Sequence, residues 1–187
     1  MFMIYLFYVI GGNMNKIYII QMHTKTIPSK IVSLFTMYKY SHVAISFTKD
    51  CNVTYSFGRR NLYSVLNGGF VIEYKNGEFF NKFNDTNCRV YEIEITEEQY
   101  AVLYETIEDM KNNQENYKYD YVGIILRFLK IPITFKNKYV CSYFVAEMLK
   151  KSNICDFDKK TCFVNPKDFE NINGFHLIYT GKYALYK

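Results

Sequence analysis

A cysteine and a histidine far apart in the sequence are the side chains best placed to do chemistry. Cys141 lies at the start of an apolar segment, residues 139–149, whose pattern predicts a helix, and His42 lies in a short alternating segment, residues 40–47. A helix N-terminus lowers the pKa of a thiol because its unpaired N–H groups and its dipole favour the thiolate. A nearby imidazole supplies the base that a cysteine nucleophile needs. The pair therefore indicates the site of a thiol hydrolase or acyltransferase.

The apolar stripe that follows Cys141 also allows a structural interpretation. Phe144 and Val145 lie three and four residues after it, so on a helix the three side chains share the inward face. A buried structural cysteine gives the same pattern, and a lone cysteine more often has that role. The chemical interpretation therefore depends on a histidine that the fold brings to the thiol.

His42 has the best surroundings of the three histidines. It shares one face of its alternating segment with Ala44 and Ser46, and these small neighbours leave room for a helix end to approach the imidazole. His23 ends a strand beside polar residues, and His176 lies near the C-terminus. We therefore expect His42 to be the partner of the cysteine.

A third polar residue is expected on the next strand. Residues 53–57 predict a strand that forms a hairpin with the one around His42. Directly opposed residues of a hairpin share a face, so the neighbours of His42 are expected to be Thr54 or Ser56. A hydroxyl there would hold the ring nitrogen distal to the thiol and fix its tautomer, although more weakly than a carboxylate would.

Sequence periodicity predicts the elements that must position these side chains. Alternating runs predict strands, and apolar residues spaced by three or four predict helices. We expect strands at 17–22, 41–47, 53–57, 70–74 and 89–95, and a terminal β segment formed by 177–179 and 183–186. We expect helices from Pro28 to Tyr38, with Thr26 as a possible cap, from Thr96 to Met110, over Tyr121–Leu129 as a buried helix, and from Cys141 to Ser152, with one more turn at Pro166.

Length and composition fit one folded domain in a reducing compartment. The chain has 187 residues, of which 49% are apolar and 19% aromatic, which excludes a disordered chain. The net charge of +5 comes mostly from scattered lysines, without the dense basic run of a nucleic-acid-binding protein. Five cysteines at irregular spacing, with no CxxC pair, predict neither a disulfide framework nor a zinc site. Free thiols of this kind are typical of the cytoplasm.

Residues 1–13 differ from the domain expected at 14–187. Residues 1–10 are uniformly apolar but only about half the length needed to cross a bilayer, and no basic residue precedes them as in a signal peptide. Met14 is followed by a fresh strand, so we expect the functional chain to begin there and 1–13 to be an extension from an upstream start. The alternatives are a short membrane-associating anchor and an additional core strand or helix.

Three segments resemble one family of enzymes. Ser-His-Val-Ala-Ile at 41–45, Tyr-Lys-Tyr-Asp-Tyr-Val-Gly at 117–123 and Tyr-Val-Cys-Ser-Tyr-Phe-Val-Ala at 139–146 resemble the circularly permuted NlpC-type papain-like cysteine hydrolases. That branch includes the YiiX-like proteins and, more distantly, the lecithin–retinol acyltransferases, and in it the histidine strand precedes the cysteine helix, as here. The resemblance implies an α+β fold in which a papain-like antiparallel sheet packs against a helix with the cysteine at its N-terminus. It implies no cofactor and no metal.

The resemblance also implies roles for individual residues. Cys141 would be the nucleophile and His42 the general base. The family's third residue lies on the strand after the histidine and is commonly Glu or His, whereas the best match in this sequence is Ser56, with Thr54 beside it. Glu73 is the acid that would otherwise take this role.

The implied reaction is attack of the Cys141 thiolate on an amide or ester carbonyl, with a thioester intermediate. Tyr119 loosely matches a tyrosine that family members use near the oxyanion, and the Cys141 backbone N–H would be a second donor. The substrate would be a peptide-type amide, as for a cysteine peptidase or thiol protease, or a lipid ester. We expect a monomer.

Two other functions compete with hydrolysis. A catalytically weak or inactive binding module would keep the fold and use the pocket around Cys141 for a ligand, and the non-acidic Ser56 favours it. A lipid acyltransferase or phospholipase at a membrane surface is the second alternative. The apolar residues 1–10 and the segment Ile124–Phe128 favour that interpretation.

Overall fold

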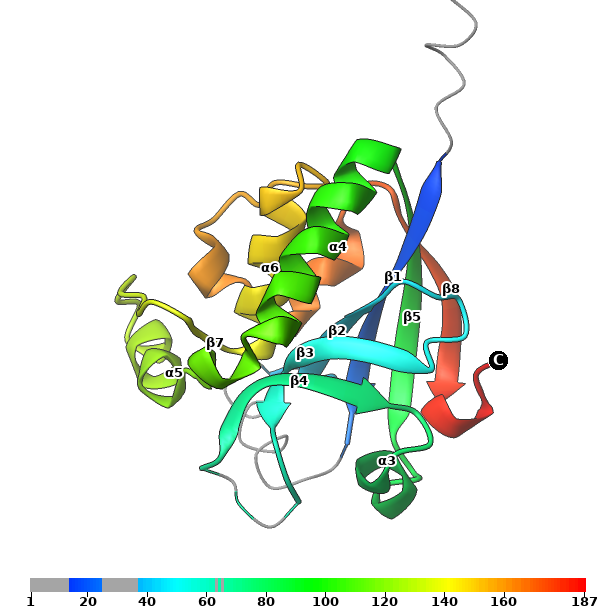
Figure 1. Ribbon diagram of the computed structural model, residues 1–187, viewed down its shortest axis with the longest axis horizontal. Helices are drawn as coiled ribbons and strands as arrows, with labels where there is room; N and C mark the ends of the chain where they lie inside the picture. The colour runs from blue at the N-terminus through cyan, green and yellow to red at the C-terminus, as the bar shows by residue number, and fades with distance from the viewer. Residues whose placement is uncertain (1–13, 25–36, 63, 65) are drawn as a thin grey trace, which may run out of the picture.

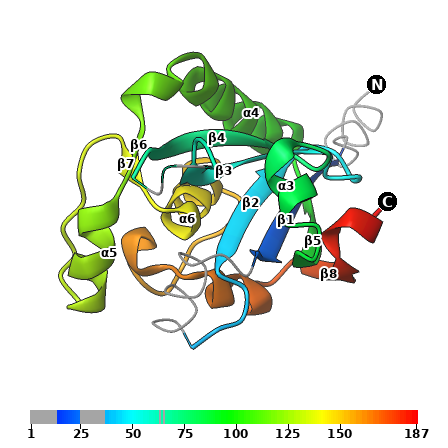
Figure 2. The ribbon, with the colours of Figure 1, turned by 90° about the horizontal axis from the view of Figure 1, so that it is seen from below.

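The alternating segments assemble into one eight-stranded sheet of an α+β fold. The structure is a computed structural model that describes residues 14–24, 37–62, 64 and 66–187. The strand order is β7-β6-β4-β3-β2-β1-β5-β8, and the sheet curls around helix α6 (Cys141–Lys151) (Figures 1 and 2). The predicted α+β class is therefore confirmed. The extension 1–13 lies outside the described residues, as does most of the helix expected from Pro28.

The five strands predicted in the first half of the chain are all present. They are β1 (Asn15–His23), β2 (His42–Ser46), β3 (Val53–Arg59), β4 (Gly68–Tyr74) and β5 (Asn87–Ile95). The sheet continues through β6 (Lys118–Tyr119), β7 (Lys138–Tyr139) and β8 (Phe175–Lys182). Neighbouring strands pair antiparallel, except that β6 and β7 are parallel.

Both faces of the central strand β1 are buried, and the alternation of its side chains divides the core in two. Ile17 and Ile19 pack with the residues of α4 (Glu97–Asn112) and α6 on one face. Tyr18 and Ile20 pack on the other face in a smaller cluster. A strand buried on both sides is apolar at nearly every position rather than at every second one, which explains the compact apolar run at the start of the domain.

The helices follow their capping signals. At the start of α4, the Thr96 hydroxyl accepts a hydrogen bond from the backbone N–H of Gln99, whose side chain accepts one from the N–H of Thr96. A short helix, α3 (Glu78–Lys82), precedes β5, and a 3-10 turn, Gln114–Asn116, follows α4. Helices α4 and α6 both pack on the sheet face that carries Ile17 and Ile19. In the described part of the chain, no helix has the length and apolar character required to cross a membrane.

The C-terminal region is built from short elements and confirms one expectation while correcting another. A 3-10 turn covers Thr161–Phe163, and Pro166 opens the next turn, Pro166–Asn171, with Asn165 as its cap. The terminal β segment ends at Lys182, and Tyr183–Leu185 is a 3-10 turn rather than a strand. The reason is that Tyr183 turns into the core, where its hydroxyl donates to the Cys51 carbonyl at 2.7 Å.

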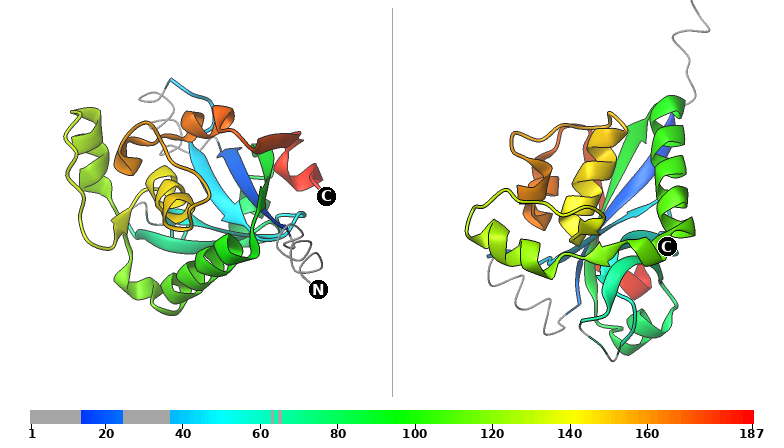
Figure 3. Two further views of the ribbon diagram at one scale, coloured as in Figure 1. Left: turned by 90° about the horizontal axis from the view of Figure 1, so that it is seen from above. Right: turned by 60° about the vertical axis from the view of Figure 1, so that its left-hand side comes forward.

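Helix α5 (Tyr121–Phe128) is present, but the expectation that it is buried is wrong. Ile125 and Phe128 are each 63% exposed, and the helix lies at the edge of the molecule beyond β6 and β7 (Figures 2 and 3). Its inward face carries Arg127, which pairs with the buried carboxylate of Asp120 at 2.7 Å. The helix is apolar on most sides, and so periodicity alone does not show which face it buries.

Candidate active site

The fold places the thiol of Cys141 beside the start of β2. Cys141 is the first residue of α6, directly after β7 and Val140, and its side chain is 6% exposed. The thiol donates a long hydrogen bond to the Ser41 carbonyl, with Sγ and O 3.9 Å apart. The N–H groups of a helix's first turn have no acceptor within the helix, so they face whatever group lies at this end. The helix end and the histidine strand therefore meet here.

The His42 imidazole lies between the thiol and a carboxylate. Its Nε2 is 2.9 Å from Oε2 of Glu73, and both side chains are largely buried. The thiol of Cys141 lies at the carbonyl of the preceding residue, Ser41, and it raises the pKa of the His42 ring. Because Nε2 is directed at Glu73, Nδ1 is the nitrogen left for the thiol. The structure thus places Cys141 beside the start of the strand that carries His42, and it places Glu73, the alternative third residue, against the ring.

The neighbours of His42 favour its protonated form. Burial lowers the pKa of the imidazole, but the negative charge of Glu73 and the hydrogen bonds with Cys141 and Glu73 outweigh this effect and hold the pKa well above its usual range. The Glu73 carboxylate therefore favours the imidazolium form of His42. That state is the natural partner of a cysteine thiolate.

The residues expected at the third position form their hydrogen bonds with groups other than the ring. Ser56 donates its hydroxyl to the Val43 carbonyl at 2.7 Å. Thr54 contacts Glu73, with its Oγ1 3.5 Å from Oε2, a long contact that supports the acid rather than the imidazole. The contact with the ring is made by Glu73, which the sequence indicated only as the alternative.

The register of the hairpin explains this difference. Ile45 pairs with Tyr55, so continuing the antiparallel ladder places Gly58 rather than Ser56 opposite His42. A Cβ built at Gly58 would lie 3.8 Å from Cε1 of His42 and 3.8 Å from Oε1 of Glu73. The alternation of the two strands did not predict a role for this glycine. The available signal was its position at the end of a strand, where a glycine marks a close approach of neighbouring groups.

Tyr119 lies on β6, the strand beside the one that leads into Cys141. Strand β6 pairs with β7 so that Tyr119 is opposite Tyr139, two residues before Cys141. Burial raises the pKa of the Tyr119 hydroxyl well above its usual range, and the charge of Cys141 raises it further. The phenol therefore stays protonated and is available as a hydrogen-bond donor near the thiol.

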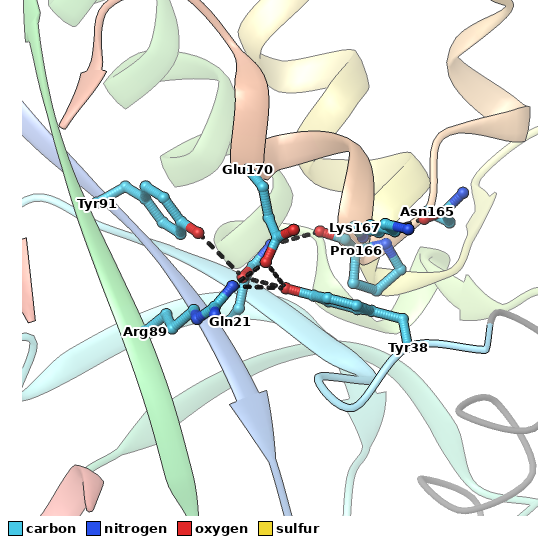
Figure 4. A network of polar contacts seen from close by, with 8 residues as sticks. All are labelled: Gln21, Tyr38, Arg89, Tyr91, Asn165, Pro166, Lys167 and Glu170. Atoms are coloured by element: carbon cyan, nitrogen blue, oxygen red, sulfur yellow. Dashed lines mark hydrogen bonds and ion pairs between the residues drawn. The ribbon is translucent and has the colours of Figure 1, made fainter. Parts of the chain in front are cut away.

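A separate polar network lies on the face of the sheet that α6 covers (Figure 4). The Tyr38 hydroxyl is 2.9 Å from Oε1 of Gln21, and it also contacts Glu170, which pairs with Arg89. The Gln21 amide donates to the Pro166 carbonyl. These contacts hold the 3-10 turn Pro166–Asn171 against β1 and β5. We assign the network a structural role because its contacts join β1, β5 and this turn.

The remaining cysteines lack comparable surroundings. Cys51, Cys88, Cys155 and Cys162 are free thiols, and burial raises the pKa of each. Within the described ranges, no cluster of three or more His, Cys, Asp and Glu side chains is arranged to hold a metal ion. Cys141 is therefore the thiol whose neighbours fit a nucleophile.

Comparison with known proteins assigns the chain to no family. No protein-family model matches the sequence, and no curated protein is significantly similar to it. The chemistry must therefore be argued from the site itself.

Proposed function

We propose that this protein is a cysteine hydrolase of the papain-like, permuted NlpC type. The observation that carries the proposal is the position of His42: its ring pairs with the Glu73 carboxylate at 2.9 Å, and the carbonyl of the residue before it lies 3.9 Å from the Cys141 thiol at the N-terminus of α6. A nucleophile, a base and a group that orients the base are the parts that covalent acyl transfer needs. The antiparallel arrangement of β1 to β5, with α6 packed against it, supports the same assignment.

In the proposed reaction, His42 holds the proton of Cys141 and the thiolate attacks the carbonyl carbon of an amide or ester. The electron pair of the carbonyl moves to its oxygen, and the oxyanion accepts hydrogen bonds from the Cys141 N–H and the Tyr119 hydroxyl. When the carbonyl re-forms, the bond to the leaving group breaks, and His42 gives its proton to the departing amine or alcohol. Water then attacks the thioester, its proton passes to His42, and a carboxylic acid and the free thiol result.

The carboxylate at the third position favours an enzyme over a binding module. The argument for a binding module was a hydroxyl in place of an acid, because a hydroxyl orients an imidazole without stabilising its positive charge. Glu73 provides a full negative charge 2.9 Å from Nε2, and such a charge stabilises the imidazolium that forms during catalysis. A non-catalytic binding module has no need of a carboxylate paired with the imidazole.

A lipid ester is the second candidate substrate. Its support is the exposed apolar surface of α5 and the loop that follows it, which ends at β7 directly before Cys141. A peptide-type amide is favoured only by the resemblance to peptidases.

Trapping of the acyl-enzyme tests the proposal. The protein is incubated with p-nitrophenyl esters and with aminoacyl-coumarin amides, quenched in acid, and examined by intact and peptide mass spectrometry. We expect a thioester adduct on Cys141 in the wild type and in Cys88→Ala, which keeps the site, and none in Cys141→Ala. Equal turnover by the wild type and Cys141→Ala, with no adduct on Cys141, would overturn the proposal.

A further inference from the structure

Helix α5 exposes its apolar side and turns its charged side inward, the reverse of the usual arrangement for a helix on a protein surface. Its exposed stripe is apolar and comprises Val122, Ile125 and Phe128, with Leu129 just after the helix. Its inward face carries the charged group, because Arg127 reaches the buried carboxylate of Asp120 and stacks on the Tyr143 ring at 5.3 Å. Surface helices normally bury the apolar face and expose the charged one. An outward apolar stripe fixed by a buried ion pair therefore indicates a surface that meets an apolar partner.

The loop after α5 extends this apolar surface. Ile131, Ile133 and Phe135 are exposed one after another on the way to β7. We call Val122, Ile125, Phe128, Leu129, Ile131, Ile133 and Phe135 the α5 surface. Single exposed apolar side chains are normal, but a contiguous group of large ones marks a site of interaction.

The exposed charges around the α5 surface are mostly positive. Residues 121–146 contain no Asp or Glu, whereas Lys130, Lys136 and Lys138 lie within or beside the apolar loop and are exposed. A hollow of about 540 Å³ between the loop and α6 is lined by Pro132 and Thr134, and its charged lining consists of three further lysines, Lys150, Lys151 and Lys160, and one acid, Glu147. Apolar side chains set among lysines combine the two attractions that bind a protein to an anionic bilayer surface.

We propose that the α5 surface is a docking site for an anionic lipid bilayer. The apolar side chains would enter the boundary between headgroups and acyl chains, and the lysines would lie at the level of the phosphates. A helix of eight residues lies on a bilayer and cannot cross it. A second copy of the chain is a poorer occupant, because a symmetric contact places the same mostly positive charges opposite one another. The proposal does not depend on the proposed thiol chemistry.

Docking there would bring the candidate active site to the membrane. In the sequence, the α5 surface connects β6, which carries Tyr119, to β7, which leads into Cys141. If the hydrolase proposal also holds, the substrate class that this placement favours is an acyl ester of a membrane lipid. The two proposals fail separately, because docking can be measured on the inactive Cys141→Ala protein.

Co-sedimentation with vesicles tests the docking site on the full chain. Vesicles of phosphatidylcholine alone are compared with vesicles that also contain phosphatidylserine, at low and at high salt. We expect binding to require the anionic lipid and to weaken with salt. Ile125→Ser with Phe128→Ser should weaken it roughly tenfold or more, and Lys130→Glu with Lys136→Glu by a similar factor.

Matched variants on the opposite edge of the sheet serve as controls. Leu177→Ser with Ile178→Ser replaces exposed apolar side chains of β8, and Lys187→Glu reverses a lysine that lines the same hollow as Ile178 and Tyr179 of that strand. Both should bind like the wild type, and Cys141→Ala should as well. All variants retain residues 1–10, so an anchor at the N-terminus would give the α5 variants and the controls equal binding. The proposal would be overturned by that equal binding or by an absence of binding to any vesicle. It would also be overturned if light scattering showed that the wild type forms a dimer that the α5 variants lose.

Discussion

Nε2 of His42 lies 2.9 Å from Oε2 of Glu73, although strand β3 lies between the two strands that carry them. Strands two places apart in a sheet are separated by roughly 10 Å, so side chains meet across the middle strand only where nothing stands between them. Gly58 on β3 leaves that gap, since even its hypothetical Cβ would touch both residues at 3.8 Å. The contact between the histidine and its carboxylate therefore depends on a glycine.

A small side chain at position 58 should leave the site intact, whereas a large one should disrupt it. Gly58→Ala adds only a Cβ, whose nearest neighbour would be Cγ2 of Val71 at 3.5 Å, so we expect a nearly normal site. Gly58→Leu extends further and should push His42 and Glu73 apart, which removes a hydrogen bond between charged groups and slows alkylation of Cys141 by about tenfold or more. Alkylation rates and an NMR titration of His42 measure this. Equal behaviour of the two variants would show that the gap is not needed.

Thiol alkylation near neutral pH should select Cys141 among the five cysteines. Burial raises the pKa of Cys51 and of Cys88 to about 12 and that of Cys155 to about 11. These thiols should react slowly, whereas Cys141 has the His42 imidazole beside it to stabilise the thiolate. Iodoacetamide labelling at pH 6 to 7, followed by peptide mass spectrometry, measures the relative labelling rates of the five cysteines. Faster labelling of the less buried Cys155 than of Cys141 would argue against an activated thiol.

Glu73→Gln and Ser56→Ala should affect different properties. Glu73→Gln removes the charge that raises the His42 pKa, so the pKa should fall and Cys141 alkylation below pH 7 should slow. Ser56→Ala removes the bond to the Val43 carbonyl and should lower the free energy of unfolding by about 0.5–1.5 kcal/mol. It should leave the alkylation rate unchanged. The opposite pattern would return the orienting role to Ser56.

The raised His42 pKa predicts how stability depends on pH. The folded state holds the proton above pH 6.5, where the unfolded imidazole releases it. The contribution of this group to stability is therefore complete below about pH 6.5 and is lost as the pH rises through the folded-state pKa. Urea unfolding of the wild type and His42→Gln across this range should show a difference that shrinks with rising pH. A difference that grows with pH would mean that the folded pKa is lowered.

Local patterns predicted most of the fold. The strands β1 to β5 alternate or run apolar over several residues, and the capping box of Thr96 and Gln99 fixed the start of α4. Strands of two residues, such as β6 and β7, are too short to show any period, so they could not be predicted. The sequence also did not predict which face of α5 is buried. That face is set by the ion pair between Asp120, at the start of the helix, and Arg127, in its last turn.

The candidate site was harder to predict than the fold. Cys141 and His42 each lie in a local pattern, at a helix start and on an alternating strand. Glu73 is separated from His42 by a whole strand, and its contact depends on the curl of the sheet, the hairpin register and the absence of a side chain at Gly58. Such long-range features leave little trace in the spacing of residues along the sequence.

The buried pair of Asp120 and Arg127 should be essential for the position of α5. The side chains are 1% and 11% exposed, and Asp120 also caps the helix by accepting a hydrogen bond from the N–H of Gly123 at 2.9 Å. Asp120→Ala leaves the guanidinium buried without its partner, and we expect it to lower the free energy of unfolding by about 3–5 kcal/mol.

Two comparison variants separate the loss of the pair from other effects of this change. Asp120→Ala with Arg127→Met removes both charges and should recover part of the loss, because no buried charge is left unpaired. Glu115→Ala breaks the ion pair of Glu115 with Arg60, in which the glutamate is exposed, and should cost no more than about 1 kcal/mol. Urea unfolding of the three variants gives the comparison. A double variant less stable than Asp120→Ala would show that Arg127 holds α5 through Tyr143 rather than through the carboxylate.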